Sequence, residues 1–188
     1  MIMDSIIEAV RRFFEVHGDD VCVIAIDGRA ASGKTTLAKR LEIEFGAGVI
    51  HMDDFFLPPE LRTEERLSTP GGNVHYERFA EEVLPKLHCP EEFSYGKFDC
   101  SVMQINGEVT VGASCVRVVE GAYAFHPYFG CYSDIRIFSD IEYEEQLRRI
   151  KARNGDEKLE TFKNRWIPLE EKYFEAYGIR EKSTLNLK

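Results

Sequence analysis

An eight-residue motif, GRAASGKT at residues 28–35, constrains this chain more than any other feature of its sequence. It matches the pattern GxxxxGK[ST] at every fixed position, and its glycines let the backbone bend so that successive N–H groups point into one cavity. The apolar run at 21–26 before it is typical of a strand buried on both faces, and a helix is predicted from Lys34 to Phe45. Because the motif lies between a strand and a helix, the sequence predicts a phosphate-binding loop and not a chance match in a glycine-rich turn.

Most residues of this loop have a predicted role in holding the phosphates of a nucleotide and a magnesium ion. The side chain of Lys34 supplies a positive charge for the β- and γ-phosphates, and the hydroxyl of Thr35 is suited to bind Mg²⁺. The positive end of the following helix dipole points at the same anion. The predicted nucleotide-binding residues are Gly28, Ala30, Ala31, Ser32, Gly33, Lys34, Thr35 and Thr36.

Acidic residues follow three further predicted strands, at the edge where a parallel sheet binds its ligands. The strands are predicted at 49–52, 115–119 and 134–138, and the acids after them are Asp53 with Asp54, Glu120 and Asp140. A hydroxyl group that attacks phosphorus needs a carboxylate to orient it and accept its proton, and we assign this role to Asp53. Glu120 is assigned to the magnesium site with Thr35. Asp54 is expected to cap or turn the chain, and Asp140 to be the N-cap of the next helix.

Arginines gather on the predicted helix after the strand at 134–138. Arg149 and Arg153 are four residues apart and therefore on one helical face, from which they could fold over the triphosphate and stabilise the transferring group. The alternative is a solvated face on which the arginines, Arg148 included, pair with Glu144 and Glu145. The sequence leaves both interpretations open, and the position of the helix favours the first.

The rest of the chain alternates helices with strands, which predicts one α/β domain over residues 1–188 with a mainly parallel sheet covered on both faces. Helices are predicted at 4–17, 76–87 and over most of 142–176 with an interruption near 154–156, a functional loop at 57–73, and a last short strand at 184–187. A hairpin within 95–111 is expected to turn at Asn106-Gly107, a strong hairpin dipeptide. Trp166, Leu169, Tyr173 and Phe174 are expected in the core.

Charge and cysteine content limit the partners. The net charge of −9 should repel nucleic acid and anionic membranes, so neither is expected as a partner, and an anionic ligand must be held by a local cluster of amides, lysine and arginine. The five cysteines are odd in number and form no CxxC pair, which favours reduced thiols and a cytoplasmic location. The expected partner is a small-molecule substrate, and a homo-oligomer is left open.

Three aromatic residues, Tyr95, Phe98 and Tyr123, could stack on the ring of a substrate or pack in the core. We assign Tyr95 and Phe98, with Asp53, to the substrate site.

With these residues in view, the chain resembles the uridine kinase and phosphoribulokinase family over most of its length. The segments that carry the resemblance are 27–36, 51–56, Phe98-Asp99, 119–121 and the arginines at 148–153. The run Asp53-Asp54-Phe55-Phe56 is also similar to nicotinamide riboside kinases. The resemblance implies a three-layer α/β/α fold with a five-stranded parallel sheet, a small substrate hairpin at about 95–111, a mobile lid at about 148–165, and ATP as the phosphate donor.

The resemblance also implies that Asp53 activates the acceptor hydroxyl, that Phe98 lies near the substrate ring, and that Arg149 and Arg153 serve the lid. Two departures concern the acceptor and not the reaction type. Residues 99–104 lack the histidine expected just beyond the hairpin of nucleoside kinases, and residues 69–76 lack the acid pair of uridine–cytidine kinases.

The leading hypothesis is an ATP-dependent kinase that phosphorylates a hydroxyl of a nucleoside-like acceptor. A nucleoside-monophosphate kinase is an alternative, which would need further basic residues at the acceptor site, and Arg62, Arg66 and Arg78 are the candidates. A non-catalytic, regulatory ATP-binding module is another, although the chain carries Lys34, Asp53 and Glu120. A GTPase is excluded because the sequence contains neither an NKxD guanine-binding motif nor a DxxG switch.

Overall fold

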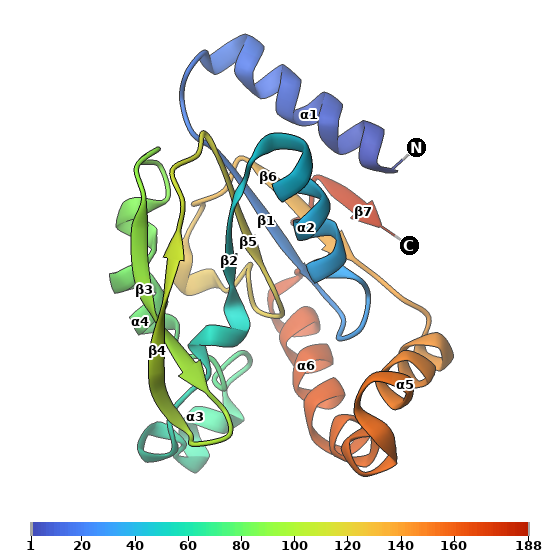
Figure 1. The fold of residues 1–188 in the computed structure, drawn as a ribbon. Helices are drawn as coiled ribbons and strands as arrows, with labels where there is room; N and C mark the ends of the chain where they lie inside the picture. Colours follow the sequence, from blue (N-terminus) through green and yellow to red (C-terminus); the bar gives the residue numbers. More distant parts are fainter. Residues whose placement is uncertain (1, 188) are drawn as a thin grey trace.

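A computed structural model describes residues 2–187 of the chain and shows a five-stranded parallel sheet with strand order β2-β5-β1-β6-β7 (Figure 1). The strands are β1 (Cys22–Gly28), β2 (Gly48–His51), β5 (Val116–Glu120), β6 (Ile135–Ser139) and β7 (Leu185–Leu187). Every pairing within this sheet is parallel. The predicted α/β class and the five-stranded parallel sheet are therefore confirmed.

Six helices accompany the strands in the described part of the chain: α1 (Ile2–His17), α2 (Lys34–Phe45), α3 (Glu64–Ser68), α4 (Tyr76–Glu82), α5 (Tyr143–Thr161) and α6 (Ile167–Tyr177). The helix predicted at 76–87 ends at Glu82, because Pro85 cannot continue it and a short 3₁₀ turn at Leu84–Lys86 follows. The predicted interruption of the last helical region is a kink in α5 at Gly155, whose φ is 82°. A single π-helical segment, Phe162–Trp166, joins α5 to α6. No helix within 2–187 combines the length and the apolar composition needed to span a membrane.

Strand β1 lies at the centre of the sheet and is buried along its whole length. Successive side chains of a strand point to opposite faces, so Ile24 and Ile26 pack in the cluster that contains residues of α1 and α2, while Val23 and Ala25 pack in the cluster that contains Phe79 of α4. Each valine or isoleucine side chain buried in this way contributes about 1.5–3 kcal/mol. The unbroken apolar run in the sequence is the result of two hydrophobic cores, one on each face.

A two-stranded antiparallel hairpin lies beside the sheet, formed by β3 (Phe93–Asp99) and β4 (Gln104–Val111) (Figure 1). The turn predicted at Asn106-Gly107 is wrong, because both residues belong to β4. They face the single residue Lys97 at a β-bulge, where Gly107 has a φ of 114°. The chain reverses after Asp99 instead, whose carboxylate accepts hydrogen bonds from the backbone N–H and the hydroxyl of Ser101, at 2.8 and 2.6 Å.

The carboxyl ends of the central strands lie together at one edge of the sheet. His51 at the end of β2 is in register with Glu120 at the end of β5, and Glu120 with Ile26 of β1. On the other side of β1, Gly28 is in register with Ser139 of β6. The fold therefore brings the predicted phosphate loop and the acids after β2 and β5 to one place.

Candidate active site

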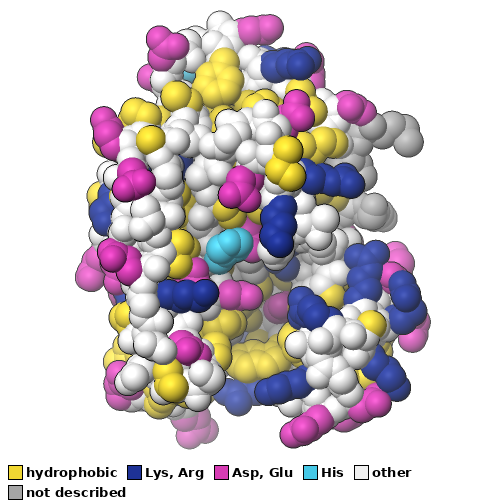
Figure 2. Space-filling model, viewed as in Figure 1, with side chains coloured by type: hydrophobic (Ala, Val, Ile, Leu, Met, Phe, Trp, Pro, Cys, Tyr) yellow, Lys and Arg dark blue, Asp and Glu magenta, His cyan; other side chains and the backbone are white. Residues whose placement is uncertain are grey.

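A cavity of about 390 Å³ opens at this edge of the sheet. Its walls come from the phosphate loop, the ends of β2 and β5, the loop before α4, and the helices α5 and α6. Figure 2 shows this face of the molecule hollowed, with hydrophobic and acidic side chains inside and Lys and Arg side chains on the rim. The lining residues are Ala30, Ala31, Gly33, Lys34, Thr35, Thr36, Met52, Asp53, Phe56, Asn73, Val74, Glu120, Gly121, Ala122, Tyr123, Arg149, Arg153, Phe162, Trp166 and Glu170.

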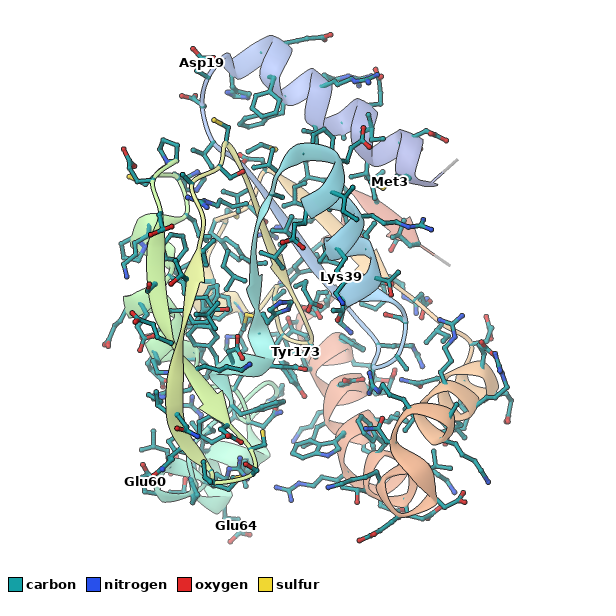
Figure 3. The ribbon with its side chains drawn as sticks, in the orientation of Figure 1. Met3, Asp19, Lys39, Glu60, Glu64 and Tyr173 are labelled. Carbon is teal, nitrogen blue, oxygen red and sulfur yellow. The ribbon has the colours of Figure 1, made fainter. Side chains whose placement is uncertain are left out.

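A fully buried carboxylate, Asp27, fixes the start of the phosphate loop to the rest of the fold. It accepts hydrogen bonds from the backbone N–H groups of Gly28 (2.7 Å), Tyr123 (3.2 Å) and Phe125 (2.9 Å). The hydroxyl of Tyr173, which α6 directs toward the strand ends in Figure 3, donates a fourth at 2.8 Å. Burial raises the pKa of Asp27, and these donors offset part of the rise. Asp27 is a structural acid that the sequence interpretation did not single out.

The phosphate loop presents most of its predicted residues to the cavity. Lys34 is buried, and its ammonium group donates to the carbonyl oxygens of Gly28 and Arg29, both at 2.8 Å. Six of the eight predicted nucleotide-binding residues line the cavity. The exceptions are Gly28 and Ser32. The N–H of Gly28 donates to Asp27 and the N–H of Ser32 to the carbonyl of Arg29, and these hydrogen bonds stabilise the conformation of the loop.

The two predicted magnesium ligands meet beside Lys34. The hydroxyl of Thr35 donates to the Oε1 atom of Glu120 at 3.1 Å, and His51 Nδ1 lies 2.6 Å from the same oxygen. The hydrogen bond with Glu120 raises the pKa of His51. No cluster of three or more His, Cys, Asp or Glu side chains suited to a metal ion exists within 2–187. Two hard oxygen ligands nevertheless fit Mg²⁺, which usually takes one or two protein oxygens together with substrate phosphates and water.

Asp53, the predicted base, lines the cavity and is open to it, whereas Asp54 is buried. Partial loss of hydration at the cavity wall, followed by the negative charge of Glu120, raises the pKa of Asp53. Asp54 accepts a hydrogen bond from the hydroxyl of Tyr95 at 2.9 Å. Instead of only capping or turning the chain, Asp54 therefore anchors the hairpin to the segment after β2.

The structure does not bring the predicted ring-binding residues, Tyr95 and Phe98, to the cavity. Both are buried, with 2% and 5% of their surface exposed, and neither is part of the cavity wall. Tyr95 packs on Phe55 at a centroid distance of 5.1 Å. The assignment of Tyr95 and Phe98 to the substrate site finds no support in this geometry: Tyr95 holds the hairpin against the core, and Phe98 is buried away from the cavity wall.

The arginines of α5 fit both interpretations that the sequence left open: a solvated face with ion pairs, and a face directed at the cavity. Arg148 and Arg149 each form an ion pair with Glu145, at 2.6 and 2.7 Å. Arg149 also donates to the carbonyl of Ala31 in the phosphate loop at 3.2 Å, and Arg149 and Arg153 line the cavity. Arg148 does not, so one arginine belongs to the solvated face and two to the candidate site.

Asp140 is not the N-cap that the sequence suggested. Glu142 is the N-cap residue of α5, and the Asp140 carboxylate instead bridges Arg29 at 3.0 Å and Arg180 at 2.7 Å. Two guanidinium groups draw it away from the helix end.

The sequence interpretation also missed part of the cavity wall. Phe56, Phe162 and Trp166 supply aromatic surface, and Asn73 and Glu170 supply polar groups. A signal for Glu170 exists: residues 166, 170 and 173 follow helical spacing, so a glutamate stands in the inward stripe of α6. Trp166, expected in the core, lines the cavity, whereas Tyr173 and Phe174 are buried as expected.

No protein-family model and no curated protein matches the sequence, but solved structures match the fold. The chain is similar to a possible uridine kinase from Bacillus stearothermophilus, with 18% sequence identity and a TM-score of 0.71 over 100% of this chain and 99% of that one. It is similar to a provisionally assigned fructose transport system kinase from Silicibacter sp. TM1040, with 19% identity and a TM-score of 0.73 over 100% of both chains. The chain has the P-loop kinase fold. At this sequence identity the likeness extends to the fold, and the chemistry must be argued from the cavity.

Within this P-loop kinase fold, Arg148 and Arg149 form a matched pair. For a phosphoryl-transfer reaction in this cavity, Arg149→Ala is expected to lower kcat/KM by about 10²-fold, because it removes a positive charge from the cavity wall. Arg148→Ala is expected to leave kcat/KM within about twofold, since an exposed ion pair contributes little. Steady-state kinetics of both variants decide the point, and equal effects would show that Arg149 acts only through Glu145.

Proposed function

We propose that this protein is an ATP-dependent kinase that transfers the γ-phosphoryl group to a hydroxyl of a nucleoside-like small molecule. One observation carries the proposal: the open carboxylate of Asp53 shares a single cavity with Lys34 and with the Thr35–Glu120 pair. A phosphate-binding loop alone needs no base. A carboxylate that is accessible from the same cavity gives an acceptor hydroxyl a group to receive its proton.

In the proposed reaction, Asp53 orients the acceptor hydroxyl and takes its proton. A bond forms between the hydroxyl oxygen and the γ-phosphorus, and the bond from that phosphorus to the bridging oxygen of ADP breaks. Lys34, Arg149 and Arg153 stabilise the negative charge on the transferring group. Thr35 and Glu120 would hold Mg²⁺, which when bound neutralises charge on the phosphates. Closure of α5 and α6 over the cavity would exclude water that otherwise hydrolyses ATP.

The remaining cavity wall supports an acceptor with a ring. Phe56, Phe162 and Trp166 offer flat apolar surface, and Asn73 offers an amide for hydrogen bonds. One similar structure is named as a possible uridine kinase, in agreement with a nucleoside-like acceptor.

A nucleoside-monophosphate acceptor is less well supported, because each of its three candidate arginines already has a partner, including Arg62, which donates to the carbonyl of Leu57 at 2.7 Å. Arg66 pairs with Glu77 at 2.6 Å, and the buried Arg78 donates to the carbonyls of Asp54 and Gly96. Only Arg62 of the three forms no ion pair with a carboxylate among residues 2–187. A regulatory module without catalysis would have no use for the open carboxylate of Asp53.

An acceptor screen tests the proposal. Formation of ADP from ATP and Mg²⁺ should be measured with uridine, cytidine, nicotinamide riboside, fructose, pantothenate, ribulose 5-phosphate and the nucleoside monophosphates. We expect turnover that depends on a nucleoside-like acceptor. Turnover only with the monophosphates would favour the alternative acceptor class.

The raised pKa of Asp53 predicts the shape of the pH profile. A base must be ionised to accept a proton, so kcat/KM should fall as the pH is lowered through the pKa of Asp53, and the rise in this pKa moves the fall toward neutrality. The profile should be recorded from about pH 3.5 to pH 9 with saturating Mg²⁺, a range that includes the ordinary pKa of an aspartate. A rate that stays constant down to the ordinary pKa of a carboxyl group would contradict the role of Asp53 as the base.

The proposal includes a cytoplasmic location and small-molecule partners without nucleic acid or membrane, for which the net charge of −9 is the support.

A further inference from the structure

The phosphate loop already holds a carboxylate of the protein itself. The backbone N–H of Ala30 donates to the Oε2 atom of Glu170 at 3.0 Å. Glu170 comes from α6, has 6% of its surface exposed, and lines the same cavity as Lys34. A carboxylate oxygen on a loop N–H occupies the type of position that a phosphate oxygen would take.

Glu170 accepts a hydrogen bond from the loop, whereas two other side chains that contact the loop donate to it. Gln146 and Arg149 of α5 donate to the carbonyl oxygens of Ala30 and Ala31, at 3.1 and 3.2 Å. Those two contacts use carbonyl groups and no N–H group of the loop. Glu170 uses an N–H group and adds a negative charge, so it competes with a phosphate both for the donor and through charge.

We propose that Glu170 is a positioning residue that occupies the phosphate loop as an internal anion, and that a bound triphosphate displaces it from the Ala30 N–H. The inference rests on the proposed nucleotide-binding function. Because Glu170 belongs to α6, its displacement links the arrival of phosphate to the position of that helix and of the π-helical segment before it. Its charge lowers the affinity for triphosphate and prevents an empty loop from holding other anions tightly.

Charged groups on several elements face Glu170. Burial raises its pKa to about 7, Lys34 of α2 opposes the rise, and Asp27 of β1 and Glu171 of α6 add to it. Tyr123, after β5, has its own pKa raised by burial and by Glu170, and Arg149 of α5 lines the same cavity. Glu170 is therefore neutral below about pH 7 and charged above it. Competition with phosphate should strengthen as the pH rises through this value.

The test is the affinity of the full chain for ATP and for tripolyphosphate, measured by titration calorimetry from about pH 6 to pH 8.5. Glu170→Gln keeps an acceptor for Ala30 and removes the charge. The matched control is Glu171→Gln, which makes the same charge change at the adjacent residue. Glu171 pairs with Arg29 at 3.1 Å and does not line the cavity. The protonation of ATP changes identically with pH in all samples. The ratio of the variant's affinity to the wild-type affinity at each pH therefore reports only the change in the protein.

At pH 8 we expect Glu170→Gln to bind ATP at least about tenfold more tightly than the wild type, and the ratio to approach one at pH 6. Glu171→Gln should show no pH-dependent change in the ratio. Equal or weaker binding by Glu170→Gln at every pH would overturn the inference and leave Glu170 as a structural anchor. Sulfate does not change its protonation between about pH 6 and pH 8.5, so a fall in its affinity for the wild type as the pH rises supplies a readout that does not require the variant to fold. Absence of ATP binding in every sample would overturn the proposed function as well, whereas binding without acceptor-dependent turnover would overturn only the kinase reaction.

Discussion

Asp53→Asn is expected to lower the rate of phosphoryl transfer by about 10²–10⁴-fold while the affinity for ATP changes by less than about threefold. The amide is nearly the same size as the carboxylate, so the cavity keeps its shape, but it cannot accept the proton of the acceptor hydroxyl. Asp53 lines the cavity and makes no hydrogen bond to the phosphate loop, so the nucleotide site should be unaffected. Single-turnover kinetics and calorimetry with ATP measure the two quantities separately.

Asp54→Asn is the matched control, because the two acids are adjacent and only Asp53 lines the cavity. Asparagine can still accept the hydrogen bond from the hydroxyl of Tyr95, so the hairpin should stay in place. Because Asp54 does not line the cavity, any effect of Asp54→Asn should appear in the free energy of unfolding and not in the rate of transfer. If Asp53→Asn loses ATP binding and transfer in equal measure, Asp53 is a structural or metal-linked residue and not the base.

Lys34→Met is expected to reduce kcat/KM by at least about 10²-fold and to weaken ATP binding as well. Among residues 2–187, Lys34 is the only lysine in the cavity wall, and two loop carbonyls hold its ammonium group, so no neighbouring lysine of this range replaces it. Methionine keeps the length and apolar stem of the side chain and removes the charge. The measurement is kcat/KM together with the Kd for ATP.

Lys39→Met provides the comparison for Lys34. Lys39, labelled in Figure 3, belongs to the same helix, is exposed, and is not part of the cavity wall. Lys39→Met should leave kcat/KM and the Kd for ATP within about twofold of the wild type. It changes the net charge by the same amount as Lys34→Met, but outside the cavity wall, where solvent screens the charge. Similar losses in both variants would mean that net charge, and not a positioned ammonium group, explains the effect of Lys34.

Local patterns predicted the parts of the fold in which a residue's surroundings are set by its neighbours in sequence. The run at 21–26 predicted a strand because both faces of β1 are covered, and the eight-residue motif predicted the loop because its backbone conformation requires glycine at positions such as Gly33, with a φ of 103°. The two acids that share the strand ends with this loop, Asp53 and Glu120, followed from the rule that ligands bind at the carboxyl edge of a parallel sheet.

The errors arose where contacts between distant segments decide the outcome. Asn106-Gly107 favours a tight turn locally, yet pairing with β3 makes it a bulge, and Asp99 holds the reversal elsewhere. Tyr95 is as suited to stacking on a ring as to packing, and only the position of Asp54, far away in sequence, assigns it to the core. Glu170 and Glu171 are neighbours of identical chemistry, and the direction of α6 alone places one in the cavity and the other on Arg29.

The most direct test of the proposed chemistry is to follow the fate of the γ-phosphoryl group. ATP labelled with ¹⁸O in its γ-phosphate should be incubated with the protein, Mg²⁺ and the acceptor mixture, and the products should be analysed by ³¹P NMR and mass spectrometry. The account predicts a phosphomonoester of the acceptor that carries the labelled oxygens, formed together with ADP and absent with Asp53→Asn. Inorganic phosphate as the only labelled product, formed with ADP at the same rate with and without acceptors and unchanged by Asp53→Asn, would contradict it.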